Sequence, residues 1–213
     1  MSRPMPHTNY VPLLPLTKEL YEGLFAIYNR AKTNTCMFYV EGFENSETLW
    51  TETEEDHQWI IDNILPHYGL TLDDLQELVY VKEDKDNTEA SNNRDDTDRA
   101  KWSFTNVPPW GPRSLNFTRT SAISFIDHHT DPEGGCKINI PVLNIRAADI
   151  YFTDSDERCF YPTTTLFNVR LPHSVNNLEN MGQYTPPFRV FFQIVLKESF
   201  DHWKEILPLP YGF

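Results

Sequence analysis

Apolar side chains in the N-terminal part of the chain, residues 1–81, follow a helical period. They recur every three or four positions at Leu20, Leu24, Ile27 and Ala31. The residue before residue 18 is Thr17, a residue type that favours a helix N-terminus. The spacing places these apolar side chains on one face and predicts an amphipathic helix that begins at residue 18.

A second helix is predicted at residues 54–65. Its first turn is acidic, which suits the positive end of the helix dipole, and its apolar residues again recur at helical spacing. Pro66 is expected to end it, because proline lacks the N–H group that a helix interior needs. Between the two helices, residues 37–40 form a short apolar run that favours a strand.

A third helix is predicted to begin at Thr71. Asp74 stands three residues later, where its side chain completes a capping box with this threonine. The helix is expected to bury Leu72, Leu75 and Leu78.

From residue 102 the pattern changes to short runs of Ile, Val, Phe, Tyr and Thr, separated by Pro, Gly, Asn and Asp. Pro141 lies inside one run, so we expect that strand to be short or at a sheet edge. The spacing favours a mainly β sandwich or jelly roll with N-terminal α-helices over an alternating βα fold. The predicted strands are residues 115–118, 122–128, 136–142, 150–152, 163–168, 173–175 and 189–196.

The whole chain, residues 1–213, is predicted to be a single domain, because this length suffices for one buried core. Residues 1–81 are its mainly helical part, and residues 82–101 form an acidic, flexible loop with almost no apolar side chains. Residues 102–199 form the β core. Residues 200–213 form a C-terminal tail with one helical turn and a proline-rich end.

Composition narrows the classes of function. The net charge of −13 disfavours nucleic-acid binding, which needs clustered Lys and Arg. The 3 cysteines and the lack of a signal-like N-terminal segment argue for a reducing compartment, and we expect the cytoplasm. No apolar run is long enough for a membrane helix, so no membrane partner is expected.

Metal-ligating residue types gather in the β-rich part. His129 and Asp131 are two positions apart at the end of a predicted strand, so both side chains point to the same face. His173 begins a later strand and offers a third ligand. Two histidines and one carboxylate suit a non-haem Fe(II) that keeps open coordination positions. His128 faces the other way and stays an alternative to His129.

An arginine opens the last predicted strand, as a carboxylate-bearing cosubstrate would need. Arg189 shares one strand face with Phe191 and Gln193, whereas the other face is wholly apolar. We therefore expect the arginine face to point into the protein and the apolar face to pack against helices. Asn139, on the strand after the His-x-Asp triplet, is a possible second contact to the cosubstrate.

In the order and context of these residues, residues 118–196 resemble the Fe(II)/2-oxoglutarate-dependent dioxygenase superfamily. The family pattern is His-x-Asp, a distal His and a downstream Arg. Here it falls on His129, Asp131, His173 and Arg189.

Two runs, residues 137–141 and 171–177, are also similar to prolyl- and aspartyl/asparaginyl-hydroxylase-like branches of that superfamily. The gap from His173 to Arg189 is longer than in the family. Residues 176–187 would therefore be an insertion.

The resemblance implies a double-stranded β-helix, or cupin-like jelly roll, over residues 102–199. It implies Fe(II) held by the catalytic residues His129, Asp131 and His173, with 2-oxoglutarate bound by Arg189 and Asn139, and O2 as the oxidant. The implied reaction is hydroxylation of a C–H bond in a peptidyl (Pro, Asp or Asn) or small-molecule substrate, with decarboxylation of 2-oxoglutarate to succinate. Because halogenating relatives lack the carboxylate ligand, Asp131 favours hydroxylation.

Two alternatives remain open. The chain could be a catalytically degenerate metal-binding barrel that serves as an interaction module. It could also be a cupin-type zinc hydrolase or isomerase, because zinc accepts the same three ligands. Arg189 distinguishes the cases, since neither alternative needs an arginine in the metal pocket.

The remaining histidines and Cys136 are expected to have structural rather than chemical roles. His7, His57, His67 and His202 are expected at the surface or at helix ends. Cys136 follows two glycines, but no histidine is arranged to activate it as a nucleophile, so we expect a buried thiol.

Overall fold

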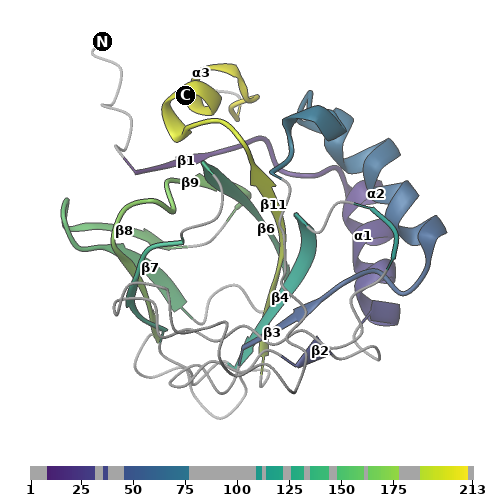
Figure 1. Cartoon of the computed structure of the whole chain (residues 1–213), viewed down its shortest axis with the longest axis horizontal. Coiled ribbons are helices and arrows are strands. Elements are labelled where there is room, and N and C mark those ends of the chain that lie inside the picture. The colour runs from purple at the N-terminus through teal and green to yellow at the C-terminus, as the bar shows by residue number, and fades with distance from the viewer. Residues whose placement is uncertain are drawn as a thin grey trace, which may run out of the picture.

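The computed structural model describes residues 9–31, 36–37, 46–76, 109–111, 114–121, 126–131, 135–143, 148–160, 163–177 and 188–210. It is mainly β, with two antiparallel sheets and, within those residues, three α-helices. Helices α1 (Lys18–Ala31) and α2 (Glu54–His67) lie on the outer side of the larger sheet, and the smaller sheet lies on its other side (Figure 1). The predicted mainly β fold with flanking helices is confirmed.

Within the described part of the chain, the larger sheet has seven strands. Its two longest, β6 and β11, are neighbours and pair over most of their length. In spatial order the strands are β1 (Tyr10–Pro12), β9 (Thr165–Phe167), β6 (Cys136–Leu143), β11 (Phe188–Leu196), β4 (Leu115–Ser121), β3 (Ser46–Leu49) and β2 (Cys36–Met37).

The smaller sheet holds the predicted histidine ligands and has four strands among the residues that the structure describes. In spatial order these strands are β5 (Ile126–His129), β10 (His173–Asn177), β7 (Ala148–Phe152) and β8 (Glu157–Phe160). Every β segment predicted from residue 115 onward overlaps an observed strand. The strands β1, β3 and β8 were missed, because they are short and partly polar and are strands only through their neighbours.

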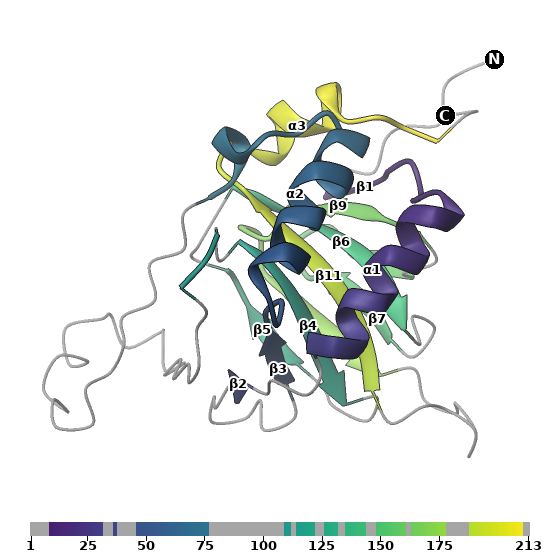
Figure 2. The same ribbon diagram turned by 90° about the vertical axis from the view of Figure 1, so that its right-hand side faces the viewer.

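Capping hydrogen bonds explain where the two long helices begin. The Leu20 N–H donates to Thr17 Oγ1 at 3.3 Å, and the Asp56 N–H donates to Thr53 Oγ1 at 3.1 Å. Both helices lie across the outer face of the larger sheet (Figure 2). The helix α3 (Phe200–Ile206) forms the expected helical turn of the tail.

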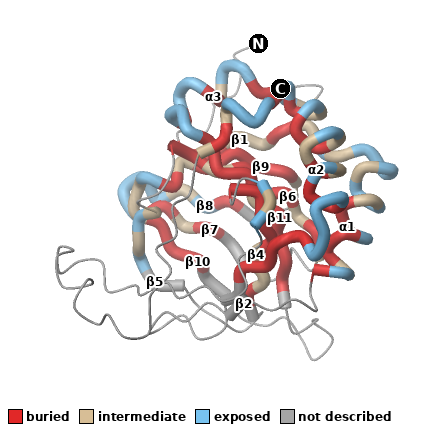
Figure 3. Tube along the Cα trace, turned by 45° about the vertical axis from the view of Figure 1, so that its right-hand side comes forward, coloured by how far each residue is buried: buried red, intermediate tan, exposed pale blue. Residues whose placement is uncertain are grey.

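Strand β11 separates two apolar clusters. Val190, Phe192, Ile194 and Leu196 are buried together with side chains of α1 and α2, whereas Phe191 packs with residues of the smaller sheet. Buried residues of the larger sheet lie between the helices and the smaller sheet (Figure 3). The predicted facing of this strand is confirmed, so the Arg189 face of β11 points toward the smaller sheet.

The prediction that the strand with Pro141 is short or at an edge is wrong. Strand β6 lies between β9 and β11. However, β9 pairs only with residues 137–139 of β6, and the β11 register shifts between Val190 and Phe191, next to the Phe191–Pro141 pair. Pro141 therefore lies past the end of β9 and next to a bulge in the β6–β11 pairing, where a missing N–H is tolerated.

The predicted helix ends also need correction. Helix α2 continues through Pro66 to His67, because the φ angle of proline is itself helical and only one more residue follows it. The predicted third helix is a single 3-10 turn, η1 (Leu72–Asp74). It stops because the Gln76 N–H bonds to Val195 O at 2.9 Å and so adds the chain to the end of β11.

Because the segment makes only this one turn, the leucines predicted to be buried are not all buried. Leu75 is buried, but Leu72 is 48% exposed, contrary to prediction. Leu78 and the predicted acidic loop, residues 82–101, lie outside the described residues. Of the predicted insertion, residues 176–177 belong to β10, and the rest lies outside the described residues.

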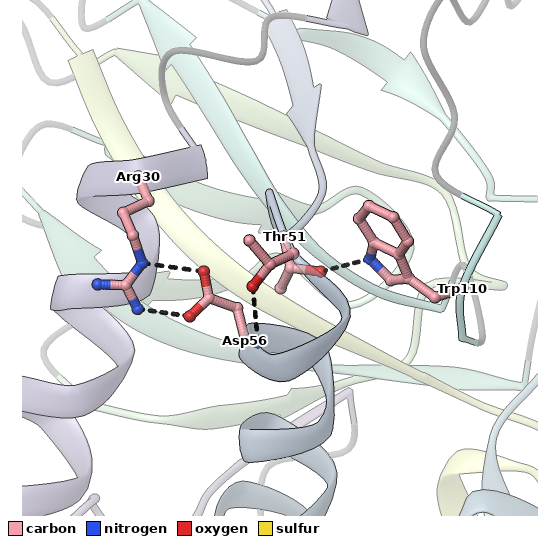
Figure 4. Close-up of polar contacts among 5 residues, drawn as sticks. Arg30, Thr51, Asp56 and Trp110 are labelled. Atoms are coloured by element: carbon pink, nitrogen blue, oxygen red, sulfur yellow. Dashed lines mark hydrogen bonds and ion pairs between the residues drawn. The ribbon is translucent and has the colours of Figure 1, made fainter.

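His57 lies near the start of α2, at a helix end as predicted, and its side chain is buried there. The turn at residues 109–111 covers it: Trp110 Nε1 donates to Thr51 Oγ1 at 3.2 Å, and this hydroxyl lies 3.4 Å from His57 Nδ1. A Cβ on Gly111 would lie 1.7 Å from His57 Nε2. The Trp110–Thr51 bond and the neighbouring Arg30–Asp56 ion pair, which joins α1 to α2, are drawn in Figure 4.

We expect acid to destabilise the protein partly through His57. Burial lowers the pKa of His57, so the unfolded chain binds this proton more readily than the folded one. The stability contribution is complete above the unfolded-state pKa of about 6.5 and is lost as the pH falls from there toward the lower folded-state pKa. Urea unfolding at about pH 7.5 and about pH 5.5 should show a larger loss for the wild type than for His57→Gln. Equal losses would contradict this.

Gly135 begins the return from the predicted metal ligands to β6. Its N–H donates to Leu196 O at 2.9 Å, and a Cβ there would lie 1.8 Å from the backbone oxygen of Glu198. Because the backbone of Glu198 cannot move away as a flexible side chain could, Gly135→Ala should lower the free energy of unfolding by about 1–3 kcal/mol. Urea unfolding of the metal-free protein measures this, and an unchanged midpoint would show that the turn adapts.

Candidate metal centre

The three predicted metal ligands meet where strands β5 and β10 adjoin. His129 ends β5 and His173 begins β10, and the two are direct cross-strand partners with ring centroids 4.3 Å apart. The Asp131 N–H donates to Val169 O at 2.9 Å, which holds the chain just past β5. One ligand atom from each of His129, Asp131 and His173 lies within 4.8 Å of the others. This triad could hold a metal ion.

The proton on His173 is placed for metal binding. His173 Nδ1 lies 2.8 Å from the carbonyl oxygen of Leu171. Because a carbonyl only accepts, Nδ1 carries the proton and Nε2 keeps its lone pair for a metal. Burial lowers the pKa of His173, although the nearby Asp131 carboxylate opposes this, so the neutral ligand form is favoured.

Asp131 presents its two oxygens to different partners. Oδ1 lies 3.6 Å from His129 Nε2, and Oδ2 accepts a hydrogen bond from Lys137 Nζ at 2.6 Å. Burial raises the pKa of the Asp131 carboxyl, but the Lys137 ammonium and the two histidines together lower it to about 2. The carboxylate is thus charged, as a metal ligand must be.

His128 does not belong to the triad. Its side chain is exposed, and its Nδ1 lies 2.9 Å from Thr153 Oγ1 on the other side of the strand. The structure therefore favours His129 over His128 as the ligand.

The structure places Arg189 and Asn139 on the other sheet, not within the triad. Arg189 is 3% exposed and lies opposite Thr120 of β4. Asn139 is 6% exposed and lies opposite Gln193 of β11. Arg189 and Gln193 lie on the face of β11 that points toward the smaller sheet. Asn139, the cross-strand partner of Gln193 on β6, points the same way.

A row of polar side chains crosses this inner face. Successive cross-strand partners are Asn116, Gln193, Asn139 and Thr165. The Oδ1 atom of Asn139 is buried and has no hydrogen-bond partner among the described residues. Gln193 is partly exposed although it lies on a central strand, so the space that it faces is open to solvent. Unsatisfied buried polar groups are costly, and a polar ligand in this space would satisfy Asn139.

The contact of Lys137 with the triad was missed from the sequence, although a signal was present, because alternation along β6 puts Lys137 on the same face as Asn139. Gln193 lies on the Arg189 face of β11, as predicted. Cys136 has the opposite facing; burial raises its pKa to about 12, as expected for a structural thiol.

No protein-family model and no curated protein sequence matches this chain. The functional assignment therefore depends on the residues and geometry described above. Among the described residues, no helix is long and apolar enough to cross a membrane.

Proposed function

We propose that the protein is an Fe(II)- and 2-oxoglutarate-dependent dioxygenase that hydroxylates a C–H bond. The observation that carries the proposal is that His129, Asp131 and His173 lie close together. The proton of His173 is on Nδ1, which leaves Nε2 available to bind a metal. His173 is buried, whereas His129 and Asp131 are partly exposed. Packing therefore fixes one ligand, and a metal or substrate can approach the centre from solvent.

The strand order supports a double-stranded β-helix for the core. Strands β5-β10-β7-β8 form one sheet, and β9-β6-β11-β4 are consecutive neighbours in the other. Along the chain, these eight strands pass between the sheets repeatedly, and each pairs antiparallel with its neighbours. This strand order supports a jelly roll, the fold that the resemblance implies.

The donor set fits iron. Two neutral imidazoles and one carboxylate would hold Fe(II) and leave positions for 2-oxoglutarate and O2, and the bound metal would supply oxidation of a substrate C–H bond as 2-oxoglutarate is decarboxylated to succinate. Phe152 pairs with His173 across the sheet, with ring centroids 6.0 Å apart, and shields one side of the buried ligand from water.

Arg189 and Asn139 are assigned to the cosubstrate. A guanidinium is always charged and pairs with a carboxylate through two parallel hydrogen bonds, which suits the far carboxylate of 2-oxoglutarate. Both side chains belong to the buried inner face of the larger sheet, opposite the sheet that holds the histidines. The substrate class is peptidyl (Pro, Asp or Asn) or small-molecule.

The test is anaerobic Fe(II) binding followed by addition of 2-oxoglutarate. We expect stoichiometric iron binding and a visible metal-to-ligand charge-transfer band that appears only with 2-oxoglutarate. Fe(II) without the cosubstrate is the control. Iron binding without the band would reject 2-oxoglutarate as the cosubstrate.

A zinc hydrolase or isomerase is the second candidate, because three protein ligands with an open position also fit catalytic zinc. Zinc binding in place of iron would favour it. A barrel that binds neither metal would be a degenerate relative or an interaction module.

A further inference from the structure

Lys137 is tied to the metal centre from the opposite sheet. It lies near the start of β6, where its cross-strand partners are Val195 of β11 and Phe167 of β9. Both partners are buried. Two strands therefore fix the backbone of Lys137, and its side chain reaches from there to the Asp131 carboxylate.

The contact is directional and partly desolvated. The side chain of Lys137 is 19% exposed and that of Asp131 is 16% exposed. The ammonium binds Oδ2 alone, so Oδ1 is the oxygen on the side of His129 Nε2. An ion pair of this kind is screened less by water than a surface pair, and it restrains the rotation of the carboxylate.

We propose that Lys137 is a positioning residue that holds back one oxygen of Asp131 and thereby reserves the open metal positions for a chelating anion of the 2-oxo acid or dicarboxylate type. This role of Lys137 rests on the proposed function, in which 2-oxoglutarate is the ligand of the open metal positions.

Lys137 can have this effect because an aspartate carboxylate binds a metal either through one oxygen or through both. With Oδ2 engaged by Lys137, only Oδ1 is available, and the second position stays open to another ligand. The ammonium also adds a positive charge beside the centre, which favours anionic ligands over neutral ones.

The test compares Lys137→Met, which removes the charge but keeps an unbranched apolar stem, with Lys137→Arg, which restores a cation. Lys18→Met is the matched control, because Lys18 is 79% exposed and pairs only with Glu22 of the same helix among the contacts described. Co2+ binds first, without any other ligand, and is followed by its visible absorption. Oxalate and 2-oxoglutarate are then titrated separately into each Co2+-loaded protein.

We expect Lys137→Met to keep Co2+ affinity within about threefold of the wild type, because Asp131 Oδ1 still binds the metal. Its affinity for oxalate should fall roughly 10- to 100-fold, a change of the size that follows when the partners of metal ligands are altered. Lys137→Arg should recover most of the loss, and Lys18→Met should match the wild type. Unchanged oxalate binding by Lys137→Met would overturn the proposal. A parallel loss of Co2+ and oxalate would also overturn it, because it would indicate only structural damage.

The outcomes also separate this inference from the proposed function. If the wild type binds Co2+ and oxalate but not 2-oxoglutarate, the dioxygenase proposal fails, and the oxalate titrations still decide the role of Lys137. If the wild type binds no oxalate, the role of Lys137 is refuted directly.

Discussion

Replacement of Asp131 by alanine is expected to remove Fe(II) binding and 2-oxoglutarate decarboxylation together. Asp131 supplies the one anionic ligand of the triad, and its ligand atom lies within 4.8 Å of those of His129 and His173. Changes to the outer partners of metal ligands cost up to about 100-fold in metal affinity or activity, so loss of the ligand itself should cost more than about 100-fold in metal affinity. Fe(II) or Co2+ titration of the purified protein measures the affinity.

The control must separate metal binding from folding. Asp131→Ala leaves the Lys137 ammonium partly buried without its carboxylate, which is itself destabilising. The double variant Asp131→Ala/Lys137→Met removes this unpaired charge and should regain stability in urea without regaining metal. Asp154→Ala, in the exposed turn between β7 and β8, matches the change in charge and should bind metal normally. Stoichiometric Fe(II) in Asp131→Ala would refute the triad.

Replacement of Arg189 by glutamine is expected to raise the 2-oxoglutarate concentration needed for half-maximal decarboxylation, with iron affinity unchanged. Hydrogen bonds to charged groups contribute about 1.5–3 kcal/mol, and 1.4 kcal/mol is a factor of ten. The expected rise is therefore roughly 10- to 100-fold. Iron affinity is expected to be spared because Arg189 is not one of the three residues that could hold the metal.

Because Arg189 is buried, its variants must first be shown to fold. Arg189→Lys keeps the charge but not the planar pair of donors, so it should recover stability more fully than cosubstrate affinity. Arg158→Gln, an exposed arginine of β8, is the control for loss of a positive charge. An unchanged 2-oxoglutarate requirement in folded Arg189→Gln would move the anchoring role to Arg170 or to Arg146, which lies outside the described residues.

Local pattern was sufficient where a segment carries its own signal. The apolar period after Thr17 predicted helix α1, because this helix has both its cap and its buried face within the segment. Alternation likewise predicted the two faces of β11. The His-x-Asp spacing predicted that His129 and Asp131 lie close together. They do, although β5 ends at His129 and a hydrogen bond to Val169 holds Asp131 just past it.

Local pattern failed where a distant partner decided the outcome. The capping signal at Thr71 is present, but Gln76 bonds to β11, so the segment makes one turn instead of a helix. Pro141 is tolerated in a central strand because of where β9 ends. His57 is buried by a turn whose Gly111 comes much later in the chain.

The sequence by itself determined the kinds of elements, their order and the ligand types, because these depend on side-chain chemistry and on short-range spacing. Only the tertiary structure decided that His173 pairs with His129 and that Lys137 holds one oxygen of Asp131. These contacts join separate strands, and in the case of Lys137 they join two sheets. They arise only when the sheets close over a common core, because no local rule specifies which distant side chains that closure brings together.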